Sequence, residues 1–223
     1  GLDLPIVNMK HQYLVTDNLP EVKALDREPP VVRDPKASCY YRQEQQGILI
    51  GPYERQGAQP WSLEGIDWDF DMELLTPELE RLETSLEFAA ERIPCWTHSG
   101  IKRVVNGPIT HTPDGGFLMG PAQGLRNYWL CCGASIGITQ GPGCGKYLAQ
   151  WMVHGQTEIN VGNMDPRRYG KWASGDYAIA KSIDEYQQMY QPYLPGEFRA
   201  SGRPIRTTPL YKILKEQGAV YGD

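Results

Sequence analysis

The 223-residue sequence has no apolar run that approaches the ~18 residues a membrane-spanning helix needs. Its first residues, GLDLPIVNMK, lack the basic and long apolar segments of a secretory signal peptide, so we expect no such leader there. It also has no basic excess: 22 lysines and arginines stand against 27 aspartates and glutamates, for a net charge of −5. The sequence therefore favours neither a membrane protein nor a nucleic-acid-binding protein.

Metal-ligand patterns are missing too. The five cysteines form no CxxC pair and the four histidines form no HExxH pattern, and an odd cysteine count in a chain of this length indicates reduced thiols. The acidic string Asp67–Glu73 has Met72 where a calcium loop of the EF-hand type needs glycine. We therefore predict no metal site, and expect Trp68 and Phe70 to pin this segment as a loop.

What is present indicates a folded protein. Hydrophobic residues make up 40% of the chain and aromatic residues 10%, while 24 glycines and 18 prolines stay below the share that signals low complexity. The length is typical of one or two domains that bury a core without disulfides.

Runs rich in β-branched and aromatic residues predict strands. Four of these segments, Ile6–Thr16, Cys39–Gln43, Gly47–Gly51 and Ile101–Val105, should share one mostly antiparallel or mixed sheet. The complete set is Ile6–Thr16, Val31–Arg33, Cys39–Gln43, Gly47–Gly51, Ile101–Thr110 with a break at Gly107-Pro108, Phe117–Gly120 and Asn127–Cys132.

Three segments predict helices. One should begin with Thr76 as the N-cap and Pro77 in the first turn, and end before Pro94. The second is Lys146–His154, which Gly155 closes, and the third covers 176–190. The tail that follows has no periodicity of its own, and we expect it to wrap another surface.

The glycine-rich segment Gly133–Gly145 lies between a predicted strand and a predicted helix, where backbone N–H groups can face an anion or a cofactor. It is not a Walker A loop, because Gln140 and Tyr147 occupy positions that need glycine and serine or threonine. It is not a GxGxxG loop either, because Lys146 stands at the last glycine position. Cofactor contact and tight strand–helix packing both remain open.

His11 and Tyr40 lie on predicted strands and are the candidate acid–base pair. A neutral imidazole and a phenol can orient and deprotonate an amine near neutral pH. The alternative is that His11 is a structural histidine of the strand.

Nearly the whole chain resembles the FAD-dependent demethylating dehydrogenases, the family of dimethylglycine and sarcosine dehydrogenases. The segments that carry the resemblance are HQYLVTD (11–17), PPVVRDPKASCYYRQEQQGILIGPYE (29–54), GIKRVVNGPITHTPDGGFLMGPAQGLRNYW (100–129), GITQGPGCGKYLAQWMVHG (137–155), MDPRRYGKW (164–172) and SGRPIRTTPLY (201–211).

The resemblance implies an α/β (α+β) fold with a mixed, largely antiparallel substrate-binding sheet, flanking helices and the returning strand–helix of an FAD-binding domain. Residues 1–160 would be the C-terminal half of the FAD-dependent oxidoreductase domain, and 161–223 a short middle domain. The family's GxGxxG half and folate-binding domain have no counterpart here. The chain thus looks like a fragment or a split subunit, and we expect it to bind FAD weakly or not at all when alone.

The resemblance also assigns residues. His11 and Tyr40 match the family's active-site histidine and tyrosine. The segment that returns to FAD matches Ser135, Ile136, Gly137, Ile138, Thr139 and Gln140.

The implied activity is oxidative demethylation of dimethylglycine or sarcosine by hydride transfer to flavin. The alternatives are a non-catalytic subunit of a larger flavoprotein complex and an oxygen-using amine oxidase of the same fold. Expected partners are the N-methylated amino acid, the missing FAD-binding and folate domains in cis or as another subunit, and an electron-transfer flavoprotein. Tetrahydrofolate would belong to the longer relatives only. The expected compartment is the bacterial cytoplasm, or alternatively the mitochondrial matrix.

Overall fold

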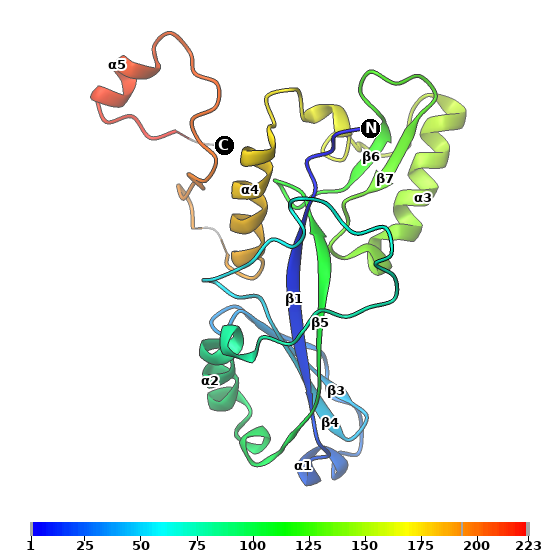
Figure 1. Ribbon diagram of the computed structural model, residues 1–223, viewed down its shortest axis with the longest axis vertical. Coiled ribbons are helices and arrows are strands. Elements are labelled where there is room, and N and C mark those ends of the chain that lie inside the picture. Colours follow the sequence, from blue (N-terminus) through cyan, green and yellow to red (C-terminus); the bar gives the residue numbers. More distant parts are fainter. Residues whose placement is uncertain (1, 193, 222–223) are drawn as a thin grey trace. The chain divides into compact units, whose positions relative to one another are not determined.

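The computed structural model describes residues 2–192 and 194–221, which form two compact units (Figure 1). The sheet unit consists of Asn8–Ile109 with Tyr186–Leu194. The hairpin unit contains Thr110–Glu185 together with the parts of the chain near both ends.

The sheet unit is built on five strands in the order β2-β3-β4-β1-β5. Antiparallel pairing joins β2 to β3, β3 to β4, and β4 to β1, which confirms the expected single sheet. The strands are β1 (Val7–Thr16), β2 (Val32–Asp34), β3 (Cys39–Glu44), β4 (Gly47–Pro52) and β5 (Ile101–His111). β3 and β4 form the predicted hairpin.

One face of this sheet carries the apolar core. Tyr41 pairs with Ile50, and Ile50 pairs with Leu14, so these side chains point to the same face. They pack with residues of helix α2 (Glu83–Arg92), including Ala89. Side chains one residue away along each strand point to the opposite face.

Helix α2 begins later than predicted. A 3₁₀ turn, η1 (Leu79–Leu82), precedes it, so Thr76 is not its N-cap. The buried amide of Gln12 accepts from the backbone N–H of Glu78 at 2.7 Å and donates to its carbonyl at 3.1 Å. The buried amide of Asn106 donates to the carbonyl of Thr76 at 2.6 Å. These tertiary hydrogen bonds hold the backbone of Thr76 and Glu78 outside the helix, where the local sequence predicts the first helical turn. The predicted end before Pro94 is correct.

Strand β5 runs through Gly107-Pro108 without the predicted break. It lies at the edge of the sheet, where proline is tolerated because one side of the strand needs no ladder bond. In the loop before η1, Phe70 packs on Trp61 with ring centroids 4.9 Å apart, whereas Trp68 is fully exposed. The prediction that both aromatics pin this loop is therefore wrong for Trp68.

The hairpin unit takes its name from strands β6 (Leu118–Pro121) and β7 (Trp129–Cys132), which pair antiparallel as predicted. Helix α3 (Gly137–His154) packs on this hairpin through Trp151 and Cys144. Gly120 makes the close approach possible: its φ is +142°, and a β-carbon there would lie 2.7 Å from the Trp151 ring.

Helix α3 begins nine residues before the predicted start, so most of the glycine-rich segment is helical rather than a loop. Glycine costs about 1 kcal/mol per residue in a helix, which is why the sequence favoured a loop. Packing overrides that preference, because Cys144 is buried against Phe117 and Met119 in the apolar cluster of this unit. The expected "returning strand–helix" therefore has its helix starting directly after Ile136.

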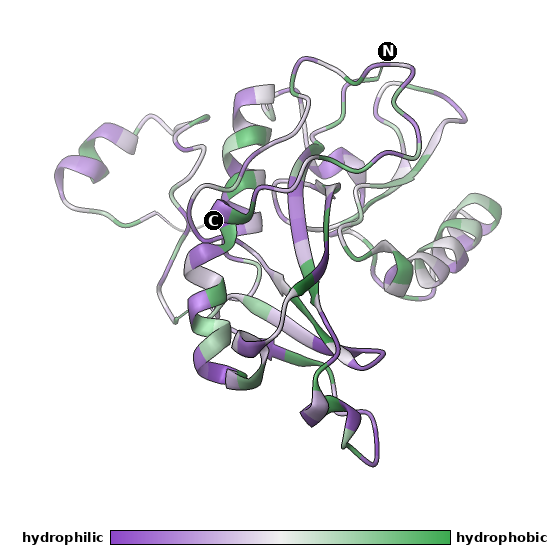
Figure 2. Cartoon of the chain, turned by 60° about the horizontal axis from the view of Figure 1, so that its bottom comes forward, coloured by the Kyte–Doolittle hydropathy of each residue, from purple (hydrophilic) through white to green (hydrophobic). Residues whose placement is uncertain are grey.

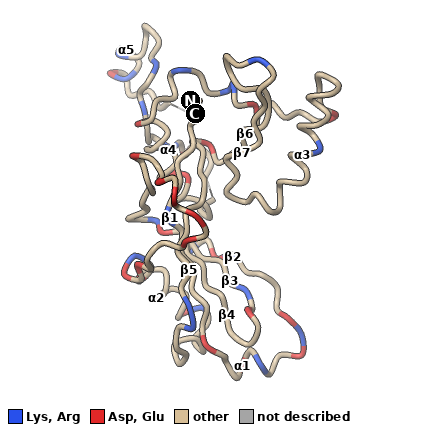
Figure 3. Tube along the Cα trace, turned by 45° about the vertical axis from the view of Figure 1, so that its right-hand side comes forward, with Lys and Arg blue, Asp and Glu red and all other residues tan. Residues whose placement is uncertain are grey.

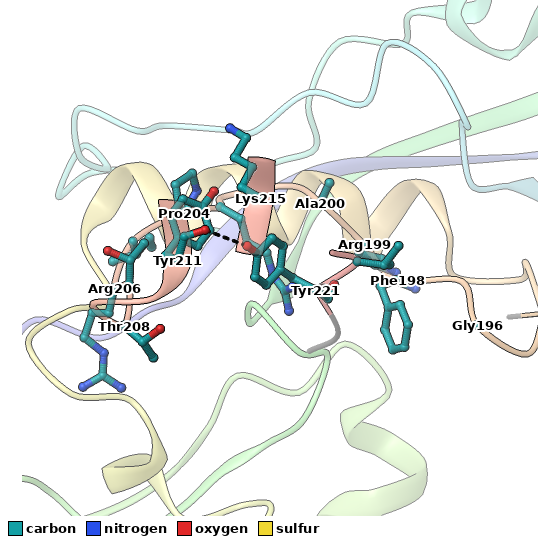
Figure 4. A pocket seen from close by; sticks show the side chains of 14 residues that line it. Gly196, Phe198, Arg199, Ala200, Pro204, Arg206, Thr208, Tyr211, Lys215 and Tyr221 are labelled. Atoms are coloured by element: carbon teal, nitrogen blue, oxygen red, sulfur yellow. Dashed lines mark hydrogen bonds between the residues drawn. The ribbon is translucent and has the colours of Figure 1, made fainter. Parts of the chain in front are cut away.

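The remaining elements are short, apart from α4 (Gly175–Gln187), which ends three residues before the predicted limit. They are α1 (Pro20–Lys23), η2 (Pro94–His98), η3 (Pro166–Arg168) and α5 (Tyr211–Glu216). Helix α5 lies in the tail, where it helps line a cavity of about 800 Å³ (Figure 4). The hydroxyl of Tyr221 donates to the carbonyl of Tyr211 at 2.9 Å across this cavity.

Charges of both signs are distributed over both units (Figure 3). Within the described residues, no helix is long and apolar enough to cross a membrane. The predicted division at residue 160 stays a prediction.

Candidate active site

His11 lies on β1 in the sheet unit, on the face opposite the apolar core, with its ring held between two tyrosine hydroxyls. Its Nε2 is 3.1 Å from the hydroxyl of Tyr40, and its Nδ1 is 3.1 Å from the hydroxyl of Tyr186. The ring is buried, whereas Tyr40 is partly exposed. The structure thus brings the two residues of the predicted pair into hydrogen-bonding distance.

The His11–Tyr40 contact does not join neighbouring strands of the sheet. Tyr40 is on β3 and His11 on β1, and β4 lies between them. Tyr40 pairs with Gly51 in β4, and a β-carbon on Gly51 would lie 2.0 Å from the Tyr40 ring. The tyrosine therefore reaches His11 by lying over a position without a side chain.

Two further tyrosines surround the pair. The Tyr53 ring is 4.4 Å from that of His11, and Tyr190 stands edge-on to Tyr53 at 5.2 Å and to Tyr40 at 6.4 Å. The guanidinium of Arg33 lies 4.1 Å over the Tyr190 ring. The result is an aromatic cluster with a cation on one side, which is a suitable surface for a small amine.

Behind His11, the hydrogen bonds lead to a buried ion pair. Tyr186 donates its hydroxyl proton to Oε2 of Glu54, whose Oε1 is 2.7 Å from a guanidinium nitrogen of Arg81. Arg81 also bonds Glu78 at 2.8 Å, and Glu78 bonds Lys10 at 2.6 Å. Every charge in this network has an opposite charge beside it, as burial requires.

The environment sets the protonation of these groups. Burial raises the pKa of the Tyr40, Tyr53 and Tyr186 phenols, so all three are neutral donors at physiological pH. Burial also raises the pKa of Glu54, against the opposing effects of the Tyr186 hydrogen bond and the Arg81 charge. The lysine and arginine hydrogen bonds to Glu78 lower its pKa.

The predicted cofactor segment Ser135–Gln140 belongs to the other unit. It forms the turn before α3 and the first turn of that helix. Ile136 is the N-cap residue and makes no side-chain capping bond, and it is 52% exposed. Ile138 is 99% exposed. The segment thus presents helix N–H groups and apolar side chains at the surface of its unit.

Sequence reasoning missed Tyr53, Tyr186, Glu54 and Arg81. The period-2 pattern could have found Tyr53, which lies two residues after Gly51 on the same face of the sheet. No local pattern could have found Tyr186, which contacts His11 from 175 positions away in the chain. Across 2–192 and 194–221, no cluster of three His, Cys, Asp or Glu side chains is arranged to hold a metal ion.

Two family profiles match the sequence. The profile for FAD dependent oxidoreductases covers residues 1–151, and the profile for their central domain covers 154–208. The chain belongs to the FAD dependent oxidoreductase family. Its cofactor is therefore FAD, as the resemblance implied.

Within this flavoprotein family, the chain is 44% identical over 222 residues to mouse mitochondrial dimethylglycine dehydrogenase, covering 97% of the chain and 26% of that relative. It is 34% identical over 224 residues to human mitochondrial sarcosine dehydrogenase, covering 99% of the chain and 24% of the relative. The chain thus spans about a quarter of the length of these relatives.

The fold likeness extends to solved structures of FAD enzymes. L-proline dehydrogenase from P. horikoshii superposes with a TM-score of 0.56 at 25% identity, covering 75% of this chain and 41% of that one. This likeness confirms the expected mixed α+β architecture of the flavoprotein.

Proposed function

We propose that this chain is the substrate-binding part of an FAD-dependent amine dehydrogenase that oxidises the N-methyl group of dimethylglycine or sarcosine. The observation that carries the proposal is the His11–Tyr40 hydrogen bond inside an aromatic cluster. The names of the two curated relatives supply the substrate class.

The chemistry of the pair suits this reaction. An amine gives up a hydride from its methyl carbon only when its nitrogen lone pair is free, so the ammonium proton must leave first. The Tyr40 hydroxyl is the group at the partly exposed end of the hydrogen bonds, and His11 beside it can take up a proton. The aromatic rings around them would hold the amine in one orientation.

The described residues of α3 fit a bound flavin. An uncapped helix N-terminus offers N–H donors to an electron-rich group, and Ile136 and Ile138 offer apolar contact. We propose that Ser135–Gln140 contacts the FAD through these groups. When bound, the flavin supplies the redox chemistry as the hydride acceptor.

We propose that the dinucleotide-binding half is supplied by a longer polypeptide or by a second subunit. Helix α3 combines hydrophobic and weakly hydrophilic residues (Figure 2), and Lys146 is the one lysine, arginine, aspartate or glutamate in its sequence. β-carbons added at Gly141, Gly143 or Gly145 would meet no atom within 4 Å, so contacts inside this chain do not require these glycines. A neighbouring chain segment that packs closely on α3 accounts for both features. An electron-transfer flavoprotein as the electron acceptor, and the mitochondrial matrix or bacterial cytoplasm as the compartment, belong to the same proposal.

The test is anaerobic reduction of the flavin-loaded protein. Dimethylglycine or sarcosine should bleach the flavin absorbance, whereas trimethylglycine should not, because its quaternary nitrogen has no lone pair. Glycine, which lacks the methyl group, is the second control. A flavin that neither dimethylglycine nor sarcosine reduces would contradict the proposed substrate class.

The alternatives give different results in the same experiment. For a non-catalytic subunit of a larger flavoprotein complex, substituting Tyr40 would leave the rate of flavin reduction by that complex unchanged. An oxidase would reoxidise rapidly when air is admitted, whereas a dehydrogenase would need an added acceptor.

A further inference from the structure

The hydrogen bonds on either side of His11 have a defined direction. Tyr186 uses its only hydroxyl proton to donate to Glu54, so its oxygen must accept the proton of His11 Nδ1. A neutral His11 with its proton on Nδ1 has a lone pair on Nε2, and Nε2 then accepts the hydroxyl proton of Tyr40. All three hydrogen bonds therefore run in the same direction: Tyr40 donates to His11, His11 donates to Tyr186, and Tyr186 donates to Glu54.

The far end of this series reaches a second cavity. A pocket of about 260 Å³ in the sheet unit is lined by Glu54 and Arg81 together with polar side chains that include Lys36, Arg55 and Gln56. The Glu54 side chain is only 2% exposed and yet lines this pocket. It is therefore the point at which the buried hydrogen bonds meet this polar space. Arg81 keeps Glu78 as a second partner, so the guanidinium remains paired if Glu54 becomes neutral.

We propose that Tyr186 and Glu54 complete a proton relay that carries the ammonium proton of the substrate away from Tyr40. This inference rests on the proposed function. In the relay, the substrate proton moves to the Tyr40 oxygen while the Tyr40 proton moves to Nε2 of His11. The Nδ1 proton of His11 moves to the Tyr186 oxygen, and the Tyr186 proton moves to Oε2 of Glu54.

The balance of this step is one proton transferred and no electron. The substrate becomes a neutral amine and the Glu54 carboxylate becomes a carboxylic acid. Both tyrosines keep one proton each, and His11 stays neutral with its proton now on Nε2. Glu54 returns its proton to solvent through the second cavity. Tyr186 and Glu54 are thus positioning residues that act through His11.

The first experiment measures flavin reduction against pH in the flavin-loaded protein. Tyr186→Phe keeps the ring packing and removes the relay, and Glu54→Gln removes the final acceptor. At pH 7 each should reduce flavin roughly 10- to 100-fold more slowly. The rate should recover at higher pH, where solvent deprotonates the amine. Tyr41→Phe is the matched control, because Tyr41 lies in the apolar core on the other face of β3, and its profile should match the wild type.

The second experiment does not need turnover. Ring-¹⁵N histidine NMR of the same loaded protein, before substrate is added, should show His11 as the Nδ1–H tautomer. Tyr186→Phe should shift the His11 signals and Tyr41→Phe should not. If Tyr186→Phe retains both the wild-type tautomer and the wild-type pH profile, the relay is wrong.

The two proposals fail in different ways. If no N-methylglycine reduces the wild-type flavin, the proposed function falls, and the NMR result still decides the direction of the hydrogen bonds. If the wild type is active and both relay variants follow its pH profile, only the relay falls.

Discussion

The two units of the molecule each bury a histidine, and only that of the sheet unit belongs to the candidate active site. His11 in the sheet unit bonds two tyrosine hydroxyls, one of which is partly exposed. His111 in the hairpin unit is 0% exposed, and burial lowers its pKa to about 4. The hydroxyl of Ser182 donates to its backbone carbonyl at 3.3 Å.

Under the proposed function, His11 is the reactive histidine and His111 is a structural one. Burial lowers the pKa of His111, which keeps its imidazole neutral near pH 7. At His11, hydrogen bonds on both nitrogens hold the ring in one orientation, and Tyr40 connects the ring to the partly exposed side of its unit. The sequence contains four histidines and marks neither of these as different by spacing.

The largest expected effect comes from separating Tyr40 from His11 without substituting either residue. In Gly51→Ala the new methyl group occupies the space of the Tyr40 ring and displaces its hydroxyl from His11. Flavin reduction by dimethylglycine should fall by roughly 100-fold or more, and overpacking should cost about 1–3 kcal/mol of stability. Stopped-flow reduction and denaturant unfolding measure the two effects.

The matched control is Gly107→Ala, a glycine in a strand of the same sheet with its nearest neighbouring atom at 3.9 Å. This variant should reduce flavin at the wild-type rate. Equal rates in Gly51→Ala and Gly107→Ala would show that the reach of Tyr40 over β4 is irrelevant to activity.

The next effect isolates the structural histidine. Because the pKa of His111 is lower in the folded protein than in the unfolded chain, its neutral form stabilises the fold above about pH 6.5. That contribution is lost as pH falls towards 4, by roughly 2–3 kcal/mol at pH 4.5. Urea unfolding at several pH values should show this loss in the wild type and a flatter curve in His111→Gln. The exposed His154→Gln should keep the wild-type slope, and an unchanged slope in His111→Gln would remove His111 as its cause.

The smallest effect concerns α3 in the hairpin unit. Gly145→Ala adds a methyl group that meets no atom within 4 Å, in the interior of a helix. Alanine should raise the free energy of unfolding of this chain by about 0.5–1 kcal/mol. In the loaded protein, the same substitution should weaken flavin retention if a neighbouring chain segment packs on this surface. A variant that raises the free energy of unfolding of this chain and retains flavin as well as the wild type does would contradict that part of the proposal.

The sheet was predictable because its strands follow a period-2 pattern that local sequence displays. Cys39-Tyr40-Tyr41 alternates core, site and core, and the structure keeps that alternation. The start of α3 was not predictable, because its glycines favour a loop locally and the packing of Cys144 that overrides them is tertiary. The prediction for the start of α2 was wrong for the same reason, because the Gln12 side chain hydrogen-bonds the backbone of Glu78 from 66 positions away.

The candidate site divides in the same manner. His11 and Tyr40 could be named from residue type, strand position and family resemblance. Tyr186 and Glu54 could not, because the fold alone brings the Tyr186 hydroxyl to His11 and the Glu54 carboxylate to Tyr186. Residue chemistry therefore identified the exposed end of the network and gave no sign of its buried end.

The most direct test of the central claim is anaerobic stopped-flow reduction by dimethylglycine of two neighbouring variants, Tyr40→Phe and Tyr41→Phe, normalised to bound flavin and repeated across pH. Both lose one hydroxyl from the same strand, on opposite faces of the sheet. The account predicts that Tyr40→Phe is at least roughly tenfold slower near pH 7 and that Tyr41→Phe matches the wild type. Wild-type rates for Tyr40→Phe at every pH would contradict it.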